Sequence, residues 1–290
     1  MGSWIPESVR VRGSAQLPLG GALIGAAVAC AVLGGAIAPH DPLRYDPRHV
    51  LAAPSASYLL GTDPLGRDIL SQVIGGARIS MLVGVVSVMA GMAAGTAIGL
   101  VAGTLRGRVS GLLMRAMDAM LVFPSLVLAL AITAFLGVSL WNVIGALAVT
   151  FVPTFALLVR GEVLSLRERD FVAAARSMGA GSGRVMCRHL LPNVMDVLLV
   201  QASLGVGTAI LTEASLSFLG LGVPPPALSW GRMLREGYSY LLLAPWISIA
   251  AGTAIFLVVL AFQMVSDGLR ELLGRRRAGV GATVAARAGR

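Results

Sequence analysis

The sequence predicts an all-α membrane protein with six transmembrane helices. Of its 290 residues, 56% are hydrophobic and only 13% are charged, whereas a soluble domain carries about a quarter charged residues. The mean hydropathy is +0.82. Several charge-free runs also exceed the roughly 20 apolar residues that a helix needs to cross a bilayer. The composition therefore predicts an integral membrane protein.

Ionisable residues mark the limits of the six predicted spans. The spans lie between Arg12 and His40, between Arg78 and Arg106, twice within 119–159, from about Val194 to Gly220, and within 237–266. The third and fourth share one charge-free run and form a tight hairpin that turns at 137–142. The fifth contains Glu213.

The first span has an alternative reading as a cleaved signal peptide. Arg10 and Arg12 precede a hydrophobic run, as they would in a signal peptide. However, the apolar stretch from Leu19 to Ile37 is longer than the usual hydrophobic region of about 7 to 15 residues. We therefore expect the segment to be retained as an anchor.

The distribution of arginine indicates the topology. The formal net charge is +9, there is no lysine, and all 23 basic residues are arginine. With the N-terminus inside, 17 arginines face the cytoplasm and six (residues 44, 48, 67, 78, 232 and 235) face outward. The positive-inside rule then predicts that both termini are cytoplasmic. The excess charge reports topology and contact with anionic lipid, so no nucleic-acid partner is expected.

The segments between spans differ in character. An external segment from Pro39 to about Gly76 is rich in Pro, Asp and Gly, and a second from Leu221 to Leu243 contains prolines 224–226 that forbid a continuous helix. Past Asp267 the chain ends in an Arg- and Gly-rich tail that we expect to be disordered.

A cytoplasmic stretch from Gly161 to Asn193 is far longer than a connection between antiparallel helices requires. It predicts one helix ending at Met178, with Gly179 in the left-handed position that closes it. A second short helix is expected to begin near Ser182, a good N-cap, and to stop before Pro192. Three consecutive alanines, 173–175, give a surface without bulk that a partner's backbone can approach closely.

This stretch resembles the EAA motif of bacterial ABC importer permeases, in which Glu-Ala-Ala is followed by a glycine, an apolar position and Leu-Pro at fixed spacings. The matching residues are Ala173 (in place of the glutamate), Ala174, Ala175, Gly179, His189 (at the apolar position), Leu191 and Pro192. The resemblance implies that this is the coupling loop that docks on an ATPase subunit.

Further segments resemble the second (C-type) permease subunit of dipeptide, oligopeptide, nickel and glutathione importers. They are 60–68, which includes Asp63, Gly66, Arg67 and Asp68, then 76–80, 213–222, 229–231 and 267–270. The resemblance implies the type I importer permease fold. Residues 1–76 would hold the N-terminus, first helix and external segment, 77–267 a five-helix core with coupling loop 161–193, and 268–290 a cytoplasmic tail.

Several residues admit two interpretations. Asp63, Arg67 and Asp68 alternate in charge, which favours an ion-pair cluster that stabilises the loop over direct contact with solute. A carboxylate such as Glu213 within a span is costly unless paired or wetted. It would, with Ser217, line the solute path or a subunit interface, or else hydrogen-bond to Ser215, Ser217 or an external arginine.

Four glycines recur every fourth residue in the second span: Gly91, Gly95, Gly99 and Gly103. They form one smooth face, and small residues allow membrane helices to pack closely. We interpret the face as helix packing, against a helix of this chain or of another subunit.

The chain itself is not expected to hydrolyse ATP, because a phosphate-binding loop needs a lysine and this sequence has none. No catalytic, cofactor-binding or metal-binding residue is predicted. The resemblance implies that two partner ATPases bind ATP and Mg, that a homologous permease completes a heterodimer in the bacterial inner membrane, and that an external binding protein delivers the solute.

A secondary transporter would need ionisable groups at mid-membrane and two matching halves, and an intramembrane enzyme would need clusters of His, Asp or Glu there. The sequence does not distinguish dipeptides, longer peptides, glutathione and nickel as the solute.

Overall fold

The computed structural model describes residues 7–105 and 107–288 and contains no β-strand within them. Five helices are long and apolar enough to cross a membrane. They are α1 (Glu7–Ile37), α2 (Ile69–Thr104), α5 (Leu140–Leu166), α8 (Leu191–Phe218) and α10 (Pro245–Ala288). These helices confirm the first, second, fourth, fifth and sixth predicted spans.

The third predicted span is present as a bent pair and not as a straight helix. α3 (Arg108–Leu121) and α4 (Ser125–Leu136) meet at an angle of 91°. Pro124 causes the break, because a proline disfavours helical geometry in the residue before it and here begins the next helix. The 12 residues of α4 rise only about 18 Å, too little to cross a bilayer alone. The expected hairpin of α4 and α5 is confirmed, with its turn at Gly137–Ser139.

The tail after Asp267 is also different from the expectation. α10 continues to Ala288 instead of ending in a disordered segment. The sequence there is rich in Arg, Leu and Ala, which favour helix, and it has no proline to end the helix. The proposed domain boundaries at 76 and 267 therefore fall inside α2 and α10.

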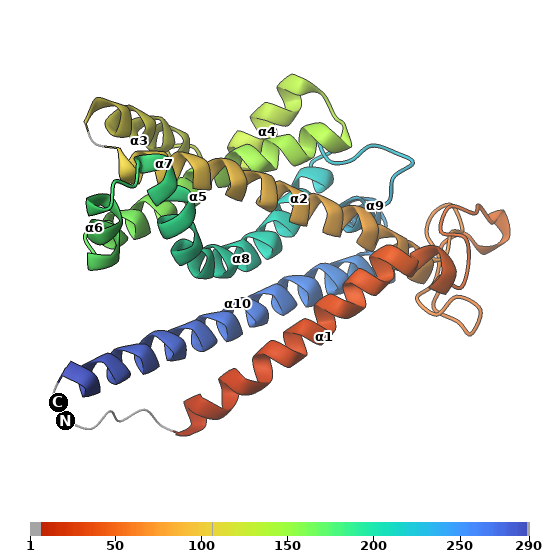
Figure 1. The fold of residues 1–290 in the computed structure, drawn as a ribbon. Helices are drawn as coiled ribbons and strands as arrows, with labels where there is room; N and C mark the ends of the chain where they lie inside the picture. The colour runs from red at the N-terminus through yellow and green to blue at the C-terminus, as the bar shows by residue number, and fades with distance from the viewer. Residues whose placement is uncertain (1–6, 106, 289–290) are drawn as a thin grey trace.

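α2 is the centre of the buried core (Figure 1). Its glycine face packs against α5 of the same chain: a Cβ on Gly95 would lie 2.6 Å from the carbonyl oxygen of Val152, and one on Gly99 would lie 2.6 Å from that of Ala156. Gly91 and Gly103 meet α5 in the same way. The glycines thus serve helix packing within the subunit, and a larger residue at any of them would force α2 and α5 apart.

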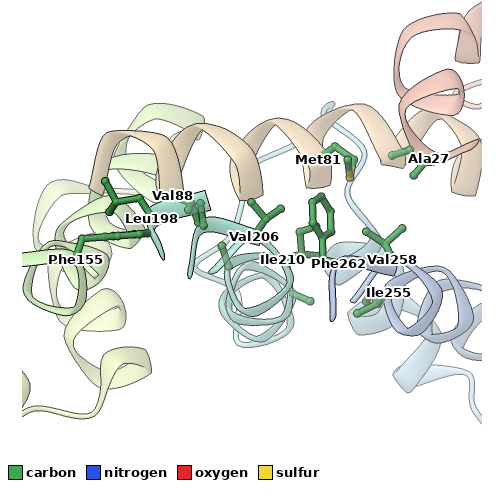
Figure 2. Packing of buried hydrophobic residues seen from close by; sticks show 14 of the residues in the cluster. Ala27, Met81, Val88, Phe155, Leu198, Val206, Ile210, Ile255, Val258 and Phe262 are labelled. Carbon is green, nitrogen blue, oxygen red and sulfur yellow. The ribbon is translucent and has the colours of Figure 1, made fainter. Parts of the chain in front are cut away.

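The other face of α2 contacts α8, with α10 and α1 beyond it. Figure 2 shows side chains from five helices meeting in one cluster. They are Ala27 of α1, Met81 and Val88 of α2, Phe155 of α5, Leu198, Val206 and Ile210 of α8, and Ile255, Val258 and Phe262 of α10. α1 packs along α10, where Gly20 lies against the carbonyl oxygen of Ala261.

The connecting elements gather at two opposite ends of the helices (Figure 1). The start of α1 and the end of α10 lie at the same end as α3, α6 (Asp170–Ser177) and α7 (Ser182–Val185). Segment 38–68, with the short helix η1 (Pro47–His49), and α9 (Trp230–Ser239) lie at the other end. Chain elements predicted to be cytoplasmic are thus together, and so are those predicted to be external.

Sequence reasoning missed helix α9. It begins directly after the prolines, where the Ser229 hydroxyl accepts a hydrogen bond from the backbone N–H of Arg232 at 3.3 Å. Trp230 anchors the helix on α2, since its indole N–H donates to the carbonyl of Val73 at 2.8 Å. A serine before an amphipathic stretch is the N-cap signal that could have revealed it.

Candidate functional site

The loop that joins α5 to α8, residues 167–190, contains most of the EAA-like pattern. α6 ends as predicted, because Gly179 adopts a φ of +83°. The N–H of Gly179 donates to the carbonyl of Arg176 at 2.9 Å, and that of Ala180 to the carbonyl of Ala175 at 3.0 Å. This is the Schellman arrangement that ends a helix at a glycine.

The sequence predicts that the three alanines share one surface, but in the structure they do not. Ala173 and Ala174 are exposed, whereas Ala175 is buried and packs inward. Phe171 and Met178 flank Ala174 at helical spacing and are exposed by 38% and 82%. We call these three residues, Phe171, Ala174 and Met178, the α6 face: a small residue between two large apolar ones. Sequence analysis missed Phe171 and Met178, although their spacing was the available signal.

The second half of the loop differs from the prediction in two respects. Ser182 is the first residue of α7, and Gly181 precedes it as the cap. The helix also does not stop before Pro192, because a π-helical stretch, η2 (Met186–Leu190), leads directly into α8. Pro192 therefore lies in the first turn of α8, directly after the π-helical stretch.

The motif residues of this second half differ in burial. Leu191 and His189 are half-buried and Pro192 is exposed. The fully buried residue is Leu190, next to the apolar motif position that His189 occupies.

Loop 167–190 is packed firmly against the membrane helices. Val172, Val185 and Leu190 are fully buried and share a cluster with Val163 of α5 and Val194 of α8. Arg167 donates from its guanidinium to the carbonyl of Gly103 near the end of α2 at 3.3 Å. A force applied to the loop would therefore reach α2, α5 and α8 together.

The side of the loop that faces away from the helices is basic. Arg169, Arg176, Arg184 and Arg188 are all exposed, and none has a carboxylate within 4.0 Å among the described residues. The one ion pair of the loop, Arg167 with Glu168 at 4.0 Å, is on the surface and contributes little to stability. The exposed side of the loop thus combines an apolar centre with unpaired positive charge.

At the opposite end of the molecule, Asp63 and Arg67 form the expected ion pair. The guanidinium of Arg67 donates to Asp63 at 2.5 Å and to Glu236 of α9 at 3.1 Å. Asp63 also accepts from the side chain of Gln72 and from the backbone N–H of Leu65, both at 2.8 Å. Asp63 and Arg67 are only 1% and 7% exposed, so their contacts fasten the segment and leave little surface for solute.

Asp68 has a different role from the one that its charge pattern suggested. It caps α2, accepting from the N–H of Ser71 at 3.0 Å, and lies 3.5 Å from His40. The last residues of the predicted external segment, from Ile69 to Gly76, are therefore the start of helix α2. Gly66, with a φ of +72°, lies so close to the carbonyl of Asp46 that no side chain would fit.

The surface of segment 38–68 holds a second polar group, in which Asp46 accepts from His49 at 2.8 Å. This hydrogen bond, with one from the backbone N–H of Arg48, holds the pKa of Asp46 below its ordinary value of 3.8. Burial raises the pKa of Tyr58, which donates to the same carboxylate.

Glu213 of α8 is completely buried within the chain. One carboxylate oxygen accepts from the Ser217 hydroxyl at 2.7 Å, and Ser217 lies 3.5 Å from the Ser229 hydroxyl at the start of α9. The other oxygen has no hydrogen-bond partner among the described residues. Of the predicted partners, Ser217 is the one present, while Ser215 bonds to its own helix. Asp196, on the same helix, was overlooked as a second acidic residue there.

The described residues contain no group of three or more His, Cys, Asp or Glu side chains placed to hold a metal ion. What the arrangement provides is mechanical: an exposed apolar and basic loop joined to a helical core at one end, and a buried polar cluster at the other.

The sequence matches a known family and several characterised relatives. The family described as the binding-protein-dependent transport system inner membrane component matches residues 95–279. The chain is 44% identical to the dipeptide transport system permease protein DppC of Alkalihalophilus pseudofirmus, across 79% of this chain and 75% of the relative. It is 41% identical to the glutathione transport system permease protein GsiD of Pectobacterium atrosepticum (81% and 78% covered) and 42% identical to that of Escherichia coli (85% and 82% covered).

Proposed function

Because the chain belongs to the binding-protein-dependent transport system inner membrane components, the permease subunits of ABC importers, we propose that it moves peptides through the membrane and is driven through loop 167–190. As a multi-pass permease subunit of the inner membrane, it is not itself an enzyme, since ATP hydrolysis belongs to the partner ATPases.

The observation that carries this proposal is the exposed α6 face on a loop whose exposed arginines are unpaired. Phe171 and Met178 are large apolar side chains that remain in water in the isolated subunit. Covering them is favourable, by about 1.5 to 3 kcal/mol for a fully buried side chain. Each of the two ATP-binding subunits would hold one permease in this way, and its groove would offer an apolar pocket with an acidic rim. Ala173, in place of the motif glutamate, contributes no charge to that contact.

The mechanism follows from the contacts of the loop. When ATP and Mg draw the partner ATPases together, α6 and α7 would move with them. Since Arg167 joins the loop to α2, and Val172, Val185 and Leu190 join it to α5 and α8, those helices would tilt together and expose the path alternately to either side. The cofactors act on the partners, and no residue of this chain is assigned to them.

We place both termini in the cytoplasm. The arginine distribution supports this orientation, and the start of α1 and the end of α10 lie at the same end as α6 and α7 (Figure 1). Segment 38–68 and α9 would then meet the external binding protein. A homologous permease would complete the path as a heterodimer.

Dipeptides, or the related tripeptide glutathione, are the proposed solutes, since relatives more than 40% identical are named for their transport. To test the function, the chain is purified from its native membrane in mild detergent and its companions are identified by mass spectrometry. We expect a second permease and ATP-binding subunits, and a binding protein would identify the solute. A chain that purifies alone and still moves peptide in liposomes would contradict the proposal and favour a secondary transporter.

A further inference from the structure

A charged recess lies at the external end of α8, apart from loop 167–190. It consists of two cavities of about 410 and 290 Å³ that share Arg232, Glu236 and Ser239 of α9 as lining residues. We call it the α9 recess. The larger cavity is in the size range of sites for small molecules, which are typically 300 to 1,000 Å³.

The charges around the α9 recess do not balance. Arg67 is paired with Asp63 and Glu236, and Arg232 donates to the other oxygen of Glu236 at 3.0 Å. Arg235 has no ion pair and no hydrogen bond among the described residues. Arg235 is thus the guanidinium of the recess that remains available to an anion.

Gly220 leaves room for the free guanidinium. It follows α8 with a φ of +90°, and a Cβ there would come within 2.4 Å of one terminal nitrogen of Arg235. The missing side chain leaves room for the guanidinium at the carbonyl end of α8, where the helix dipole stabilises a cation without neutralising it. Arg235 remains exposed, so its N–H groups are free to take a carboxylate in bidentate fashion.

The larger cavity of the α9 recess is lined by a buried serine and by two prolines. The serine is Ser217, which donates to Glu213 and is 4% exposed. The prolines are Pro224 and Pro225, and proline restricts the backbone there. By contrast, two cavities elsewhere in the described part of the chain, one along α8 and α10 and one along α1 and α10, are lined almost wholly by apolar residues.

We propose that Arg235 binds the free carboxylate of a peptide solute as it enters from outside. The inference rests on the proposed function, because dipeptides and glutathione both carry such a carboxylate. An acidic side chain of the binding protein would bring the same group, and the experiment separates that outcome.

The test uses the complete importer, with its partner permease, ATPases and binding protein, reconstituted in liposomes. Uptake of alanyl-alanine and of its C-terminal amide is measured for wild type, Arg235→Gln and Arg235→Lys. Arg44→Gln is the matched control, because Arg44 is exposed on segment 38–68, outside the recess. Co-purification of all subunits checks assembly, and the affinity of the binding protein for the liposomes is measured separately.

We expect Arg235→Gln to lower uptake of alanyl-alanine about ten-fold, the effect of losing one charge-assisted pair. Uptake of the amide, the affinity of the binding protein and both rates of Arg44→Gln should stay within two-fold of wild type. Arg235→Lys should retain part of the wild-type uptake, because lysine keeps the positive charge but lacks the paired N–H donors of the guanidinium.

Two results would overturn the inference while the importer function stands: normal alanyl-alanine uptake by Arg235→Gln, or a loss that follows a weaker affinity for the binding protein. The second would assign Arg235 to protein docking. A wild-type complex that imports neither peptide would instead remove the proposed solute class, and the inference with it.

Discussion

The connecting segments at the two ends of this subunit are held to the helices in different ways. Segment 38–68 is fastened from within: Asp63 and Arg67 are nearly inaccessible and reach α2 and α9 through ion pairs and hydrogen bonds. Loop 167–190 is fastened only on its inner side, and its outer side presents Met178, 82% exposed, and unpaired arginines to water. The charges of Asp63 and Arg67 are thus paired within the isolated chain, whereas loop 167–190 leaves apolar side chains and arginines exposed.

The largest expected effect comes from disrupting the buried ion pair of segment 38–68. Asp63→Ala would leave Arg67 and Gln72 without their shared acceptor in a buried site. Removing one partner of a buried pair costs about 3 to 5 kcal/mol. Thermal unfolding of the purified complex should show this loss. Ser57→Ala, at an exposed position on the same segment, should change stability by less than about 0.5 kcal/mol. Equal shifts for the two variants would mean that the buried cluster does not stabilise this end.

The next largest effect is expected in loop 167–190. A substitution there should uncouple ATP hydrolysis from uptake without a large loss of stability of the complex. Gly179→Val places a β-branched residue at a φ of +83°, a strain of about 1 to 2 kcal/mol that the turn relieves by changing shape. We expect uptake per complex to fall about ten-fold or more while ATP hydrolysis continues. Gly181→Val is the control, because Gly181 is extended with a φ of −67° and open space for a side chain. Unchanged transport by Gly179→Val would remove the coupling role of this loop.

A smaller effect is expected at Glu213, which is buried and accepts a hydrogen bond from Ser217 within the chain. Glu213→Gln keeps an acceptor for Ser217, so stability should change by about 1 kcal/mol and uptake per assembled complex should not change. Subunit recovery and uptake are measured on the same preparation. A fall in uptake with normal assembly would restore the alternative that Glu213 lines the solute path.

The smallest effect is at the surface of segment 38–68. Since the pKa of Asp46 is lowered in the folded state, the stabilisation it provides is present above pH 3.8 and is lost as the pH falls through the lowered pKa. Asp46→Asn should therefore lower the melting temperature slightly at pH 5, much less than Asp63→Ala, and not at all once Asp46 is protonated. An equal difference at pH 5 and at a pH well below 3.8 would exclude the Asp46 carboxylate as its source.

Sequence alone predicted the membrane fold because charge-free runs directly reflect the cost of placing charge in lipid. It also predicted the turn at Gly179, where only a short-range signal was needed. It failed where distant contacts decide. The partition of the alanines into exposed and buried positions depends on how α6 packs. The link from Arg67 to Glu236 joins residues 169 positions apart, and no local pattern reveals it.

The central claim is that the α6 face is the surface that an ATP-binding subunit covers. The most direct measurement places a photo-crosslinking amino acid, benzoylphenylalanine, at Met178 in native membranes and identifies the products by mass spectrometry. The control position is Leu242, which is 99% exposed in the connection between α9 and α10. We predict a crosslink from position 178, and none from position 242, to an ATP-binding subunit. Crosslinks from position 178 to lipid alone, in a complex that still imports peptide, would contradict the account.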